Sequence, residues 1–168
     1  IYQDKLLKVE EVKCMPNGNQ PIDISYGQGK ILSKFSKFWK KNKFDLVIAI
    51  GDRFEMFSAV QASLPFELKL AHIHGGETSL GSIDNIYRDQ ITIASSIHLT
   101  SNVFHSEKVE RIMGSKKNIY NMIKKNTIDE VIDLSEHFVV LGSGLNAIST
   151  IHGILDNYQG QVKKIYVV

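Results

Sequence analysis

Three short stretches between residues 51 and 89 concentrate side chains that can transfer protons or bind charged groups. They are GDRFE at residues 51–55, HIHGGE at residues 72–77 and GSIDNIYRD at residues 81–89. Carboxylates and imidazoles accept or deliver protons when they lie beside a bound molecule, and a positive charge stabilises a leaving oxygen. These residue types therefore point to acid–base chemistry on a polar ligand.

In the first stretch, Asp52 directly follows the apolar run of residues 45–50. At the end of a buried strand, a carboxylate can act as a base or orient a hydroxyl group of a ligand. An aspartate ahead of a helix can equally cap the free N–H groups of that helix. Position alone favours the capping role for Asp52.

In the second stretch, His72 and His74 lie two apart, so they share one face of a strand. Gly75 and Gly76 would let the backbone approach a ligand closely. With Glu77 the histidines could bind a metal, but they serve equally as proton donors and acceptors, so we expect no metal. The alternative is a hydrogen-bonded histidine pair in a plain turn. This alternative is disfavoured, because Gly-Gly-Glu directly after the histidines is an energetically costly sequence for a plain connection.

In the third stretch, Asp84 and Arg88 are four residues apart and face the same side of a helix. They could form a surface ion pair worth a few tenths of a kcal/mol. Alternatively, Asp84 points into a site from the helix N-terminus and is held there by Arg88.

The elements that must position these stretches alternate between strand and helix. Apolar runs predict strands at residues 45–50, 68–73 and 97–100 and from residue 119, and helical spacing predicts helices at residues 30–43, 53–63, 84–96 and 104–113. Such alternation is typical of an α/β, Rossmann-like, doubly wound parallel sheet. Ligands of such sheets bind beyond the carboxyl ends of the strands, where the first two stretches lie.

The chain divides into three predicted segments, namely residues 1–121, a linker helix at residues 122–136, and a βαβ unit at residues 137–168. In the last segment, Gly142, Gly144 and Ala147 fit the glycine pattern of FAD- or NAD-binding turns. Any tightly packed strand-to-helix turn can use such glycines, so both interpretations stay open.

Composition restricts the partners. The net charge of +2 is too small to indicate nucleic acid, and the lysines between residues 30 and 43 form the solvated face of an amphipathic helix. No apolar run is long enough to span a bilayer. The single cysteine, Cys14, cannot form an internal disulfide, which favours a cytoplasmic location.

Taken together, in this order and spacing, the three stretches resemble the hydrolysing UDP-N-acetylglucosamine 2-epimerases of bacterial nonulosonic-acid pathways, from about Pro21 to about Asn121. The resemblance implies the N-terminal half of a two-domain, glycosyltransferase-B-like enzyme that needs no cofactor. Loss of the C2 proton and expulsion of UDP would give a glycal, and addition of water would release the free 2-epimer.

The resemblance also implies roles for individual residues. Asp52 and Asp84 match the family's catalytic carboxylates, and His74 stands where many relatives have a catalytic glutamate. The implied substrate-binding residues are Arg53, His72, Glu77 and Arg88.

The family's N-terminal strand and C-terminal domain are not recognisable in the sequence. We therefore expect an incomplete copy that is inactive alone, with a homodimer as the common state of the family. The substrate is expected to be UDP-N-acetylglucosamine or UDP- or GDP-N,N′-diacetylbacillosamine. The alternative is an FAD- or NAD-dependent oxidoreductase N-terminus at residues 137–168, fused to an inactive epimerase remnant.

Overall fold

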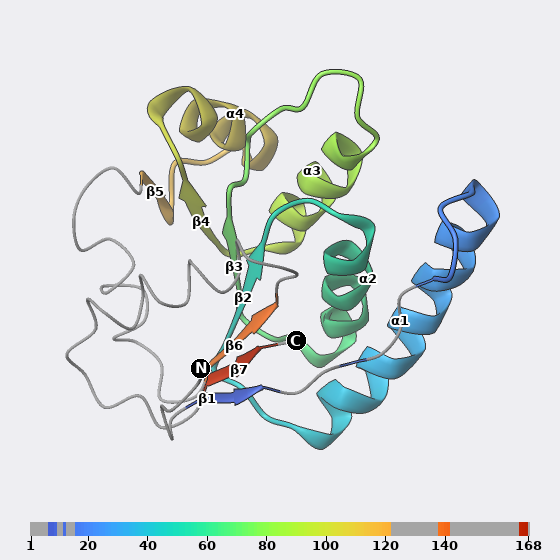
Figure 1. Cartoon of the computed structure of the whole chain (residues 1–168). Coiled ribbons are helices and arrows are strands. Elements are labelled where there is room, and N and C mark those ends of the chain that lie inside the picture. The colour runs from blue at the N-terminus through green and yellow to red at the C-terminus, as the bar shows by residue number, and fades with distance from the viewer. Residues whose placement is uncertain (1–6, 10–11, 13–15, 122–137, 142–164, 168) are drawn as a thin grey trace.

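The computed structural model describes residues 7–9, 12, 16–121, 138–141 and 165–167. Its strands form one parallel sheet of seven strands in the order β1-β7-β6-β2-β3-β4-β5 (Figure 1). The strands are β1 (Leu7–Val9), β2 (Leu46–Ile50), β3 (Leu70–Ile73), β4 (Ile97–Thr100), β5 (Ile119–Asn121), β6 (Phe138–Leu141) and β7 (Ile165–Val167).

The sheet grows in both directions from β2. The chain runs outward through β3 and β4 to β5 on one side, then returns to place β6 and β7 on the other side of β2. This confirms the predicted α/β, doubly wound, Rossmann-like class. The strand order reverses beside β2, and open sheets of this kind bind ligands in the crevice at that point, beyond the carboxyl ends.

The central strand β2 has the sequence LVIAI, and all five residues are buried. A parallel strand covered on both faces needs such a continuous apolar run rather than an alternating one. The neighbouring strands β3 and β4 are buried throughout as well. The strand ends that carry the polar stretches therefore follow strands that are buried along their whole length.

The helices connect successive strands, with α1 packed on α2, α2 on α3 and α3 on α4. They are α1 (Pro21–Lys41), α2 (Phe54–Ser63), α3 (Asp84–Ala94) and α4 (Val103–Met113), with a short 3₁₀ turn η1 at Leu64–Phe66. As predicted, α2 ends just before Pro65, which has no N–H to continue a helix.

Helix α1 begins at Pro21, nine residues earlier than its lysine-rich pattern predicts. Glycines such as Gly27 and Gly29 are typical of turns, but Gly27 lies inside the helix and is buried. A Cβ on Gly27 would lie 3.1 Å from the ring of Pro16, so this glycine admits the close approach of the preceding segment. Pro21 at the first helical position and Asp23, which accepts from the N–H of Gln20, start the helix.

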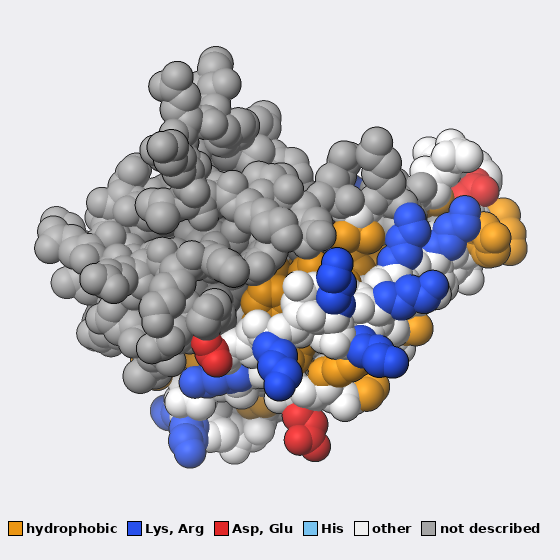
Figure 2. All heavy atoms as spheres, turned by 90° about the horizontal axis from the view of Figure 1, so that it is seen from below, with side chains coloured by type: hydrophobic (Ala, Val, Ile, Leu, Met, Phe, Trp, Pro, Cys, Tyr) orange, Lys and Arg blue, Asp and Glu red, His pale blue; other side chains and the backbone are white. Residues whose placement is uncertain are grey.

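One face of α1 anchors the helix and the other meets solvent. Phe35 and Trp39 are buried, and Trp39 donates its indole N–H to the carbonyl of Ala59 on α2 over 3.1 Å. Lysine side chains lie on the exposed face, and Figure 2 shows them along this side of the molecule. The predicted amphipathic helix is therefore confirmed.

Two features of the chain ends bear on the predicted segments. Strand β1 was not predicted, and it pairs with β7. Strand β6, with which the predicted βαβ unit begins, pairs directly with β2 from Leu46 to Ala49. The first and last predicted segments thus share one sheet. The linker helix at residues 122–136 lies outside the described residues, and the segment boundaries stay predictions.

Candidate active site at the carboxyl edge of the sheet

Three neighbouring strands deliver polar groups to one edge of the sheet. Asp52 follows β2, His74 follows β3 and Ser101 follows β4. Backbone hydrogen bonds join these strand ends. Gly51 N donates to the carbonyl of Ile73 at 3.3 Å, and His74 N donates to the carbonyl of Leu99 at 3.0 Å. The first two stretches thus lie side by side at the carboxyl ends of the strands, as predicted, where ligands of such sheets bind.

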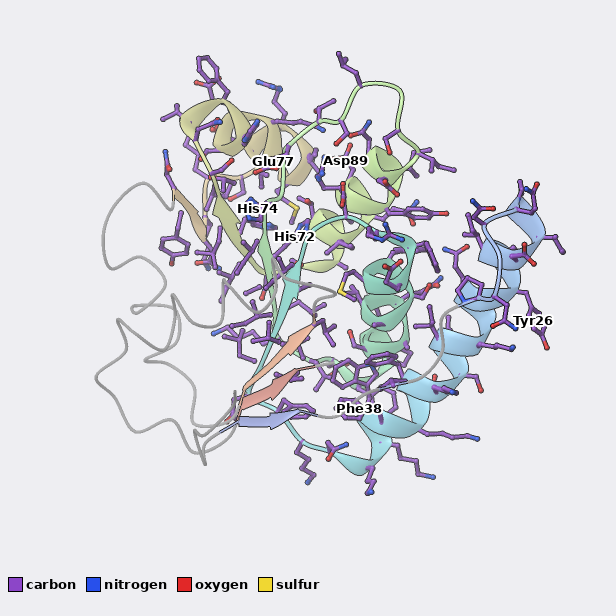
Figure 3. All side chains as sticks on the ribbon, in the orientation of Figure 1. Tyr26, Phe38, His72, His74, Glu77 and Asp89 are labelled. Carbon is purple, nitrogen blue, oxygen red and sulfur yellow. The ribbon has the colours of Figure 1, made fainter. Side chains whose placement is uncertain are left out.

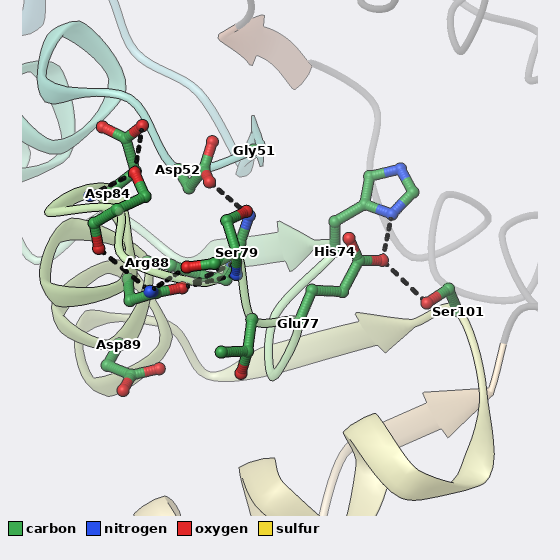
Figure 4. Close-up of polar contacts among 12 residues, drawn as sticks. Gly51, Asp52, His74, Glu77, Ser79, Asp84, Arg88, Asp89 and Ser101 are labelled. Carbon is green, nitrogen blue, oxygen red and sulfur yellow. Dashed lines mark hydrogen bonds and ion pairs between the residues drawn. The ribbon is translucent and has the colours of Figure 1, made fainter.

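Asp52 does not cap α2. The helix begins at Phe54, its N-cap is Arg53, and the Asp52 carboxylate instead forms an ion pair with the guanidinium of Arg88 (Figure 4). Only 6% of the Arg88 side chain and 20% of the Asp52 side chain are exposed, so the pair is largely shielded from water. The capping interpretation of Asp52, favoured by position alone, is therefore wrong.

Arg88 forms its ion pair with Asp52 rather than with Asp84. Among the described residues its second contact is with Asn85 Oδ1, at 3.4 Å, and its Nε has no hydrogen-bond partner. Asp84 instead accepts from Ser82 Oγ at 2.9 Å. The expected pairing of Asp84 with Arg88 is thus wrong, because Arg88 instead contacts the carboxylate that follows β2. The placement of Asp84 in a site at the N-terminus of α3 stays a prediction.

The loop before α3 is held by its own polar groups. Asn85 accepts from the N–H of Ser79 and donates to the carbonyls of Ser79 and Ser82. The half-buried carboxylate of Asp84 is thereby fixed at the first position of α3, on the same side as Asp52 and Arg88 in Figure 4.

A second polar assembly surrounds Glu77. Its Oε1 lies 2.8 Å from His74 Nδ1 and 2.7 Å from Ser101 Oγ (Figure 4). Burial alone raises the pKa of Glu77, but hydrogen bonds from Ser101 and His74 and the nearby charges of His74 and His105 outweigh it and lower the pKa. Glu77 is thus held as a carboxylate. His74 has φ +68°, a strained value for a residue other than glycine, and such strain often accompanies functional positions.

His72 occupies a different environment from His74. His72 and His74 are both labelled in Figure 3. His72 is completely buried, its Nε2 lies 2.8 Å from the carbonyl oxygen of Gly51, and its Nδ1 lies 3.0 Å from Thr92 Oγ1. Burial lowers the pKa of His72 to about 4, despite the hydrogen bond to Gly51, which raises it. His72 is therefore neutral, and its two hydrogen bonds connect β3 to the residue after β2 and to α3. Its contact with substrate stays a prediction.

The glycines after His74 admit protein rather than a ligand. A Cβ on Gly75 would lie 3.1 Å from both His72 Nδ1 and Thr92 Oγ1. A Cβ on Gly76 would collide with the carbonyl oxygen of His105, and Gly76 also has φ +79°. The expectation that these glycines let the backbone approach a ligand is thus corrected, because the space above them is filled by α3 and α4.

Arg53 and Glu55 extend the site from the start of α2. Arg53 Nε lies 2.6 Å from Glu55 Oε1, and 56% of the Arg53 side chain is exposed against 8% for Glu55. Glu55 Oε2 has no hydrogen-bond partner among the described residues. The exposed guanidinium of Arg53 is therefore held through its Nε by the buried Glu55, and its predicted contact with substrate stays a prediction.

Sequence reasoning missed Ser101 and His105. Ser101 is the first residue after β4, so the strand-end rule that selected Asp52 and His74 could have selected it too. His105 lies on α4, and its only signal is its spacing of four residues from Ser101. In the described ranges, no group of three or more His, Cys, Asp or Glu side chains is placed to hold a metal. Gly142, Gly144 and Ala147 lie outside the described residues, so an FAD or NAD site there stays a prediction.

Comparison with known proteins identifies the family. The sequence model described as UDP-N-acetylglucosamine 2-epimerase matches residues 3–139, which extends beyond the expected 21–121 at both ends. The chain belongs to this epimerase family. It is 31% identical over 122 residues to polysialic acid biosynthesis protein P7 of Escherichia coli, a match that covers 73% of the chain and 31% of that protein.

A second relative names a reaction. The chain is 32% identical over 113 residues to GDP/UDP-N,N′-diacetylbacillosamine 2-epimerase (hydrolyzing) of Campylobacter jejuni, which covers 67% of the chain and 29% of that protein. The chain thus spans about a third of the length of these relatives.

A solved structure supports the fold. The Neisseria meningitidis UDP-GlcNAc 2-epimerase, bound to UDP-GlcNAc, aligns with a TM-score of 0.57 at 12% identity, over 93% of this chain and 56% of that one. At that identity the likeness concerns the fold alone. In the part of the chain that the structure describes, no helix is long and apolar enough to cross a membrane.

Proposed function

We propose that this chain carries the acid–base half of a hydrolysing nucleotide-sugar 2-epimerase. The observation that carries the proposal is the convergence of two assemblies at one sheet edge, Asp52 with Arg88 and His74 with Glu77. Membership of the epimerase family and the hydrolysing relative from C. jejuni support it. One assembly is a shielded ion pair and the other a half-exposed imidazole backed by a carboxylate, so the two differ in acid–base character.

The two assemblies fit the two stages of the reaction. His74 donates Nδ1–H to Glu77, so its Nε2 lone pair takes the C2 proton of the sugar. The bond from C1 to the diphosphate oxygen breaks, its electron pair leaves with UDP, and a C1–C2 double bond forms. Water then adds its hydroxyl to C1 while C2 is reprotonated on the opposite face. Asp52 and Asp84, on the other side of the site, orient hydroxyl groups, and one of these carboxylates takes the proton that the adding water loses and passes it to C2. His74 returns the proton that it took from C2 to solvent.

Arg53 fits the departing diphosphate. Its exposed guanidinium stands at the start of α2, where the N-cap side chain makes no capping hydrogen bond. A positive charge there stabilises the negative charge that develops on the leaving oxygen.

The finer points are part of the same proposal. The substrate is UDP-N-acetylglucosamine or a UDP- or GDP-linked diacetamido analogue, for synthesis of sialic- or legionaminic-type acids. The epimerase needs no cofactor. The homodimer and the cytoplasmic location stay predictions.

A chimera tests the proposed function. The matched segment of the C. jejuni relative is replaced by residues 7–121 of this chain, so that the relative supplies the rest of the cleft. We expect UDP release from UDP-N,N′-diacetylbacillosamine or UDP-N-acetylglucosamine, with the free 2-epimer as the product in NMR spectra. Asp52→Asn should lower the rate by at least about 100-fold.

The matched control is Lys116→Gln, a change at a side chain that is 83% exposed, which should leave the rate unchanged. A folded chimera that binds the nucleotide sugar without releasing UDP would refute the function. The 168-residue chain alone should release UDP at less than about a thousandth of the rate of the chimera, because half a cleft neither positions the diphosphate nor excludes water. Asp52-dependent UDP release by the chain alone would contradict this expectation.

A further inference from the structure

The Glu77 assembly continues past Ser101 to a residue with no assigned role. Ser101 Oγ lies 2.7 Å from Glu77 Oε1 and 2.8 Å from His105 Nδ1. Glu77 Oε1 is also 2.8 Å from His74 Nδ1. Four side chains from the loop after β3, the end of β4 and the first turn of α4 thus form one hydrogen-bonded series.

The chemistry of the four groups fixes the direction of each hydrogen bond. A carboxylate only accepts, so Glu77 receives hydrogen bonds from both Ser101 and His74. Ser101 has one proton, and once it is donated to Glu77 the hydroxyl oxygen must accept from His105. Both histidines therefore carry a proton on Nδ1, which leaves Nε2 with a lone pair in the neutral ring.

Local folding holds His105 at the end of the series. Asn102 caps α4 by accepting from the backbone N–H of His105 at 3.0 Å. This starts the helix so that His105 lies one turn after Ser101. The backbone of His105 also packs directly against Gly76, where no Cβ intervenes. The docking of α4 onto the loop thus sets the distance between Ser101 and Glu77.

Other charges near Glu77 are engaged elsewhere. Lys108 Nζ lies 3.2 Å from Asp89 Oδ1, as an ion pair without hydrogen-bond geometry. The same ammonium reaches the backbone carbonyl of Glu77 at 3.5 Å and Thr78 Oγ1 at 3.3 Å. Among the described residues, the Glu77 carboxylate is therefore held by Ser101 and His74 rather than by lysine.

We propose that Ser101 and His105 are positioning residues that, through Glu77, hold His74 in its Nδ1–H form with the Nε2 lone pair directed toward the substrate. This inference rests on the proposed function of His74 and extends it to α4. His105 orients the Ser101 hydroxyl, Ser101 orients the Glu77 carboxylate, and Glu77 orients the imidazole. None of the three needs to touch the substrate.

Nitrogen-15 NMR of the histidine rings tests the series in the 168-residue chain, without substrate. The neutral rings of His74 and His105 should both show the Nδ1–H form, whereas free imidazole side chains favour Nε2–H. Ser101→Ala should return His105 to Nε2–H and raise the pKa of Glu77, read from its side-chain carbon-13 shift, because one hydrogen bond to the carboxylate is lost.

Two further variants separate positioning from folding. Ser101→Thr keeps the hydroxyl and should restore both signals. Ser106 lies on α4 outside the series, and its hydroxyl is 2.6 Å from Thr100 Oγ1. Ser106→Ala should therefore change neither signal. In the active chimera, Ser101→Ala should lower kcat about tenfold with KM nearly unchanged, and Ser101→Thr should recover it.

Each result bears on one proposal. The positioning role of Ser101 and His105 would be overturned, even if the chimera is active, by either of two results. One is a neutral His74 in the Nε2–H form, and the other is a His105 signal that does not change in Ser101→Ala. A correct NMR signature in a chain whose chimera releases no UDP would leave the series standing and refute the proposed function instead.

Discussion

Within the six residues from His72 to Glu77, two environments alternate. His72, Gly75 and Gly76 are buried beneath α3 and α4, whereas His74 and Glu77 remain 40% and 29% exposed in their side chains. The two histidines are two residues apart and chemically identical. One is a buried link to the carbonyl of Gly51, and the other stands beside a carboxylate at the open edge.

The difference arises from one backbone angle. His72 lies within β3, one residue before its end at Ile73, where side-chain direction is set by alternation. His74 has φ +68°, so the chain leaves the strand there and turns its side chain away from the core. The motif thus places a buried histidine and a partly exposed histidine two residues apart, and spacing alone does not distinguish their environments.

The largest expected effect concerns the buried half of this motif. Gly76→Ala should destabilise the fold by about 3 kcal/mol, because alanine is strained at φ +79° and its Cβ collides with the backbone of His105. Gly51→Ala is the matched control, with φ +90° but no atom within 4 Å of the added Cβ, and should cost about 1 kcal/mol. Urea unfolding measures both, and equal losses would show that the contact with α4 is unimportant.

A smaller effect distinguishes buried histidines by pH. Burial lowers the pKa of His72 and of His98, its register partner on β4, to about 4. Between pH 6.5 and about 4 the unfolded chain binds protons that the folded chain does not, so stability falls as pH falls. The free energy of unfolding should drop by up to about 1.4 kcal/mol per pH unit for each histidine.

The buried histidines can be tested singly. His72→Gln and His98→Gln should each remove about half of this slope over the acid range, as measured by urea unfolding at a series of pH values. An unchanged slope in both variants would mean that the two rings are protonated in the folded chain.

The sequence was sufficient for most of the fold because its strands are short apolar runs and its helices are amphipathic. It failed where local signals and packing disagree. The glycines at positions 27 and 29 favour a turn, yet Gly27 is tolerated within α1 because Pro16 needs the space. Strand β1 has only three residues, too few to show a pattern.

The placement of the candidate residues at the sheet edge was predicted in part, and their roles stay predictions. Strand ends identified Asp52 and His74 without knowledge of the structure. The partner of Arg88 was missed because a helical spacing of four suggested Asp84, whereas the actual partner lies 36 residues away in sequence. Ser101 and His105 were missed because serine and histidine have no distinctive pattern outside a three-dimensional hydrogen-bonded series.

The smallest expected change in stability belongs to the open half of the motif. Asparagine tolerates left-handed backbone better than most residues, so His74→Asn preserves the turn while removing the imidazole. The lost contact with Glu77 is partly exposed and should be worth less than about 0.5 kcal/mol. The same variant should lower UDP release by the chimera about 100-fold, because no ring nitrogen is left to take the C2 proton. A loss of stability comparable to that of Gly76→Ala would place His74 with the buried half of the motif and would remove the reason for assigning it chemistry.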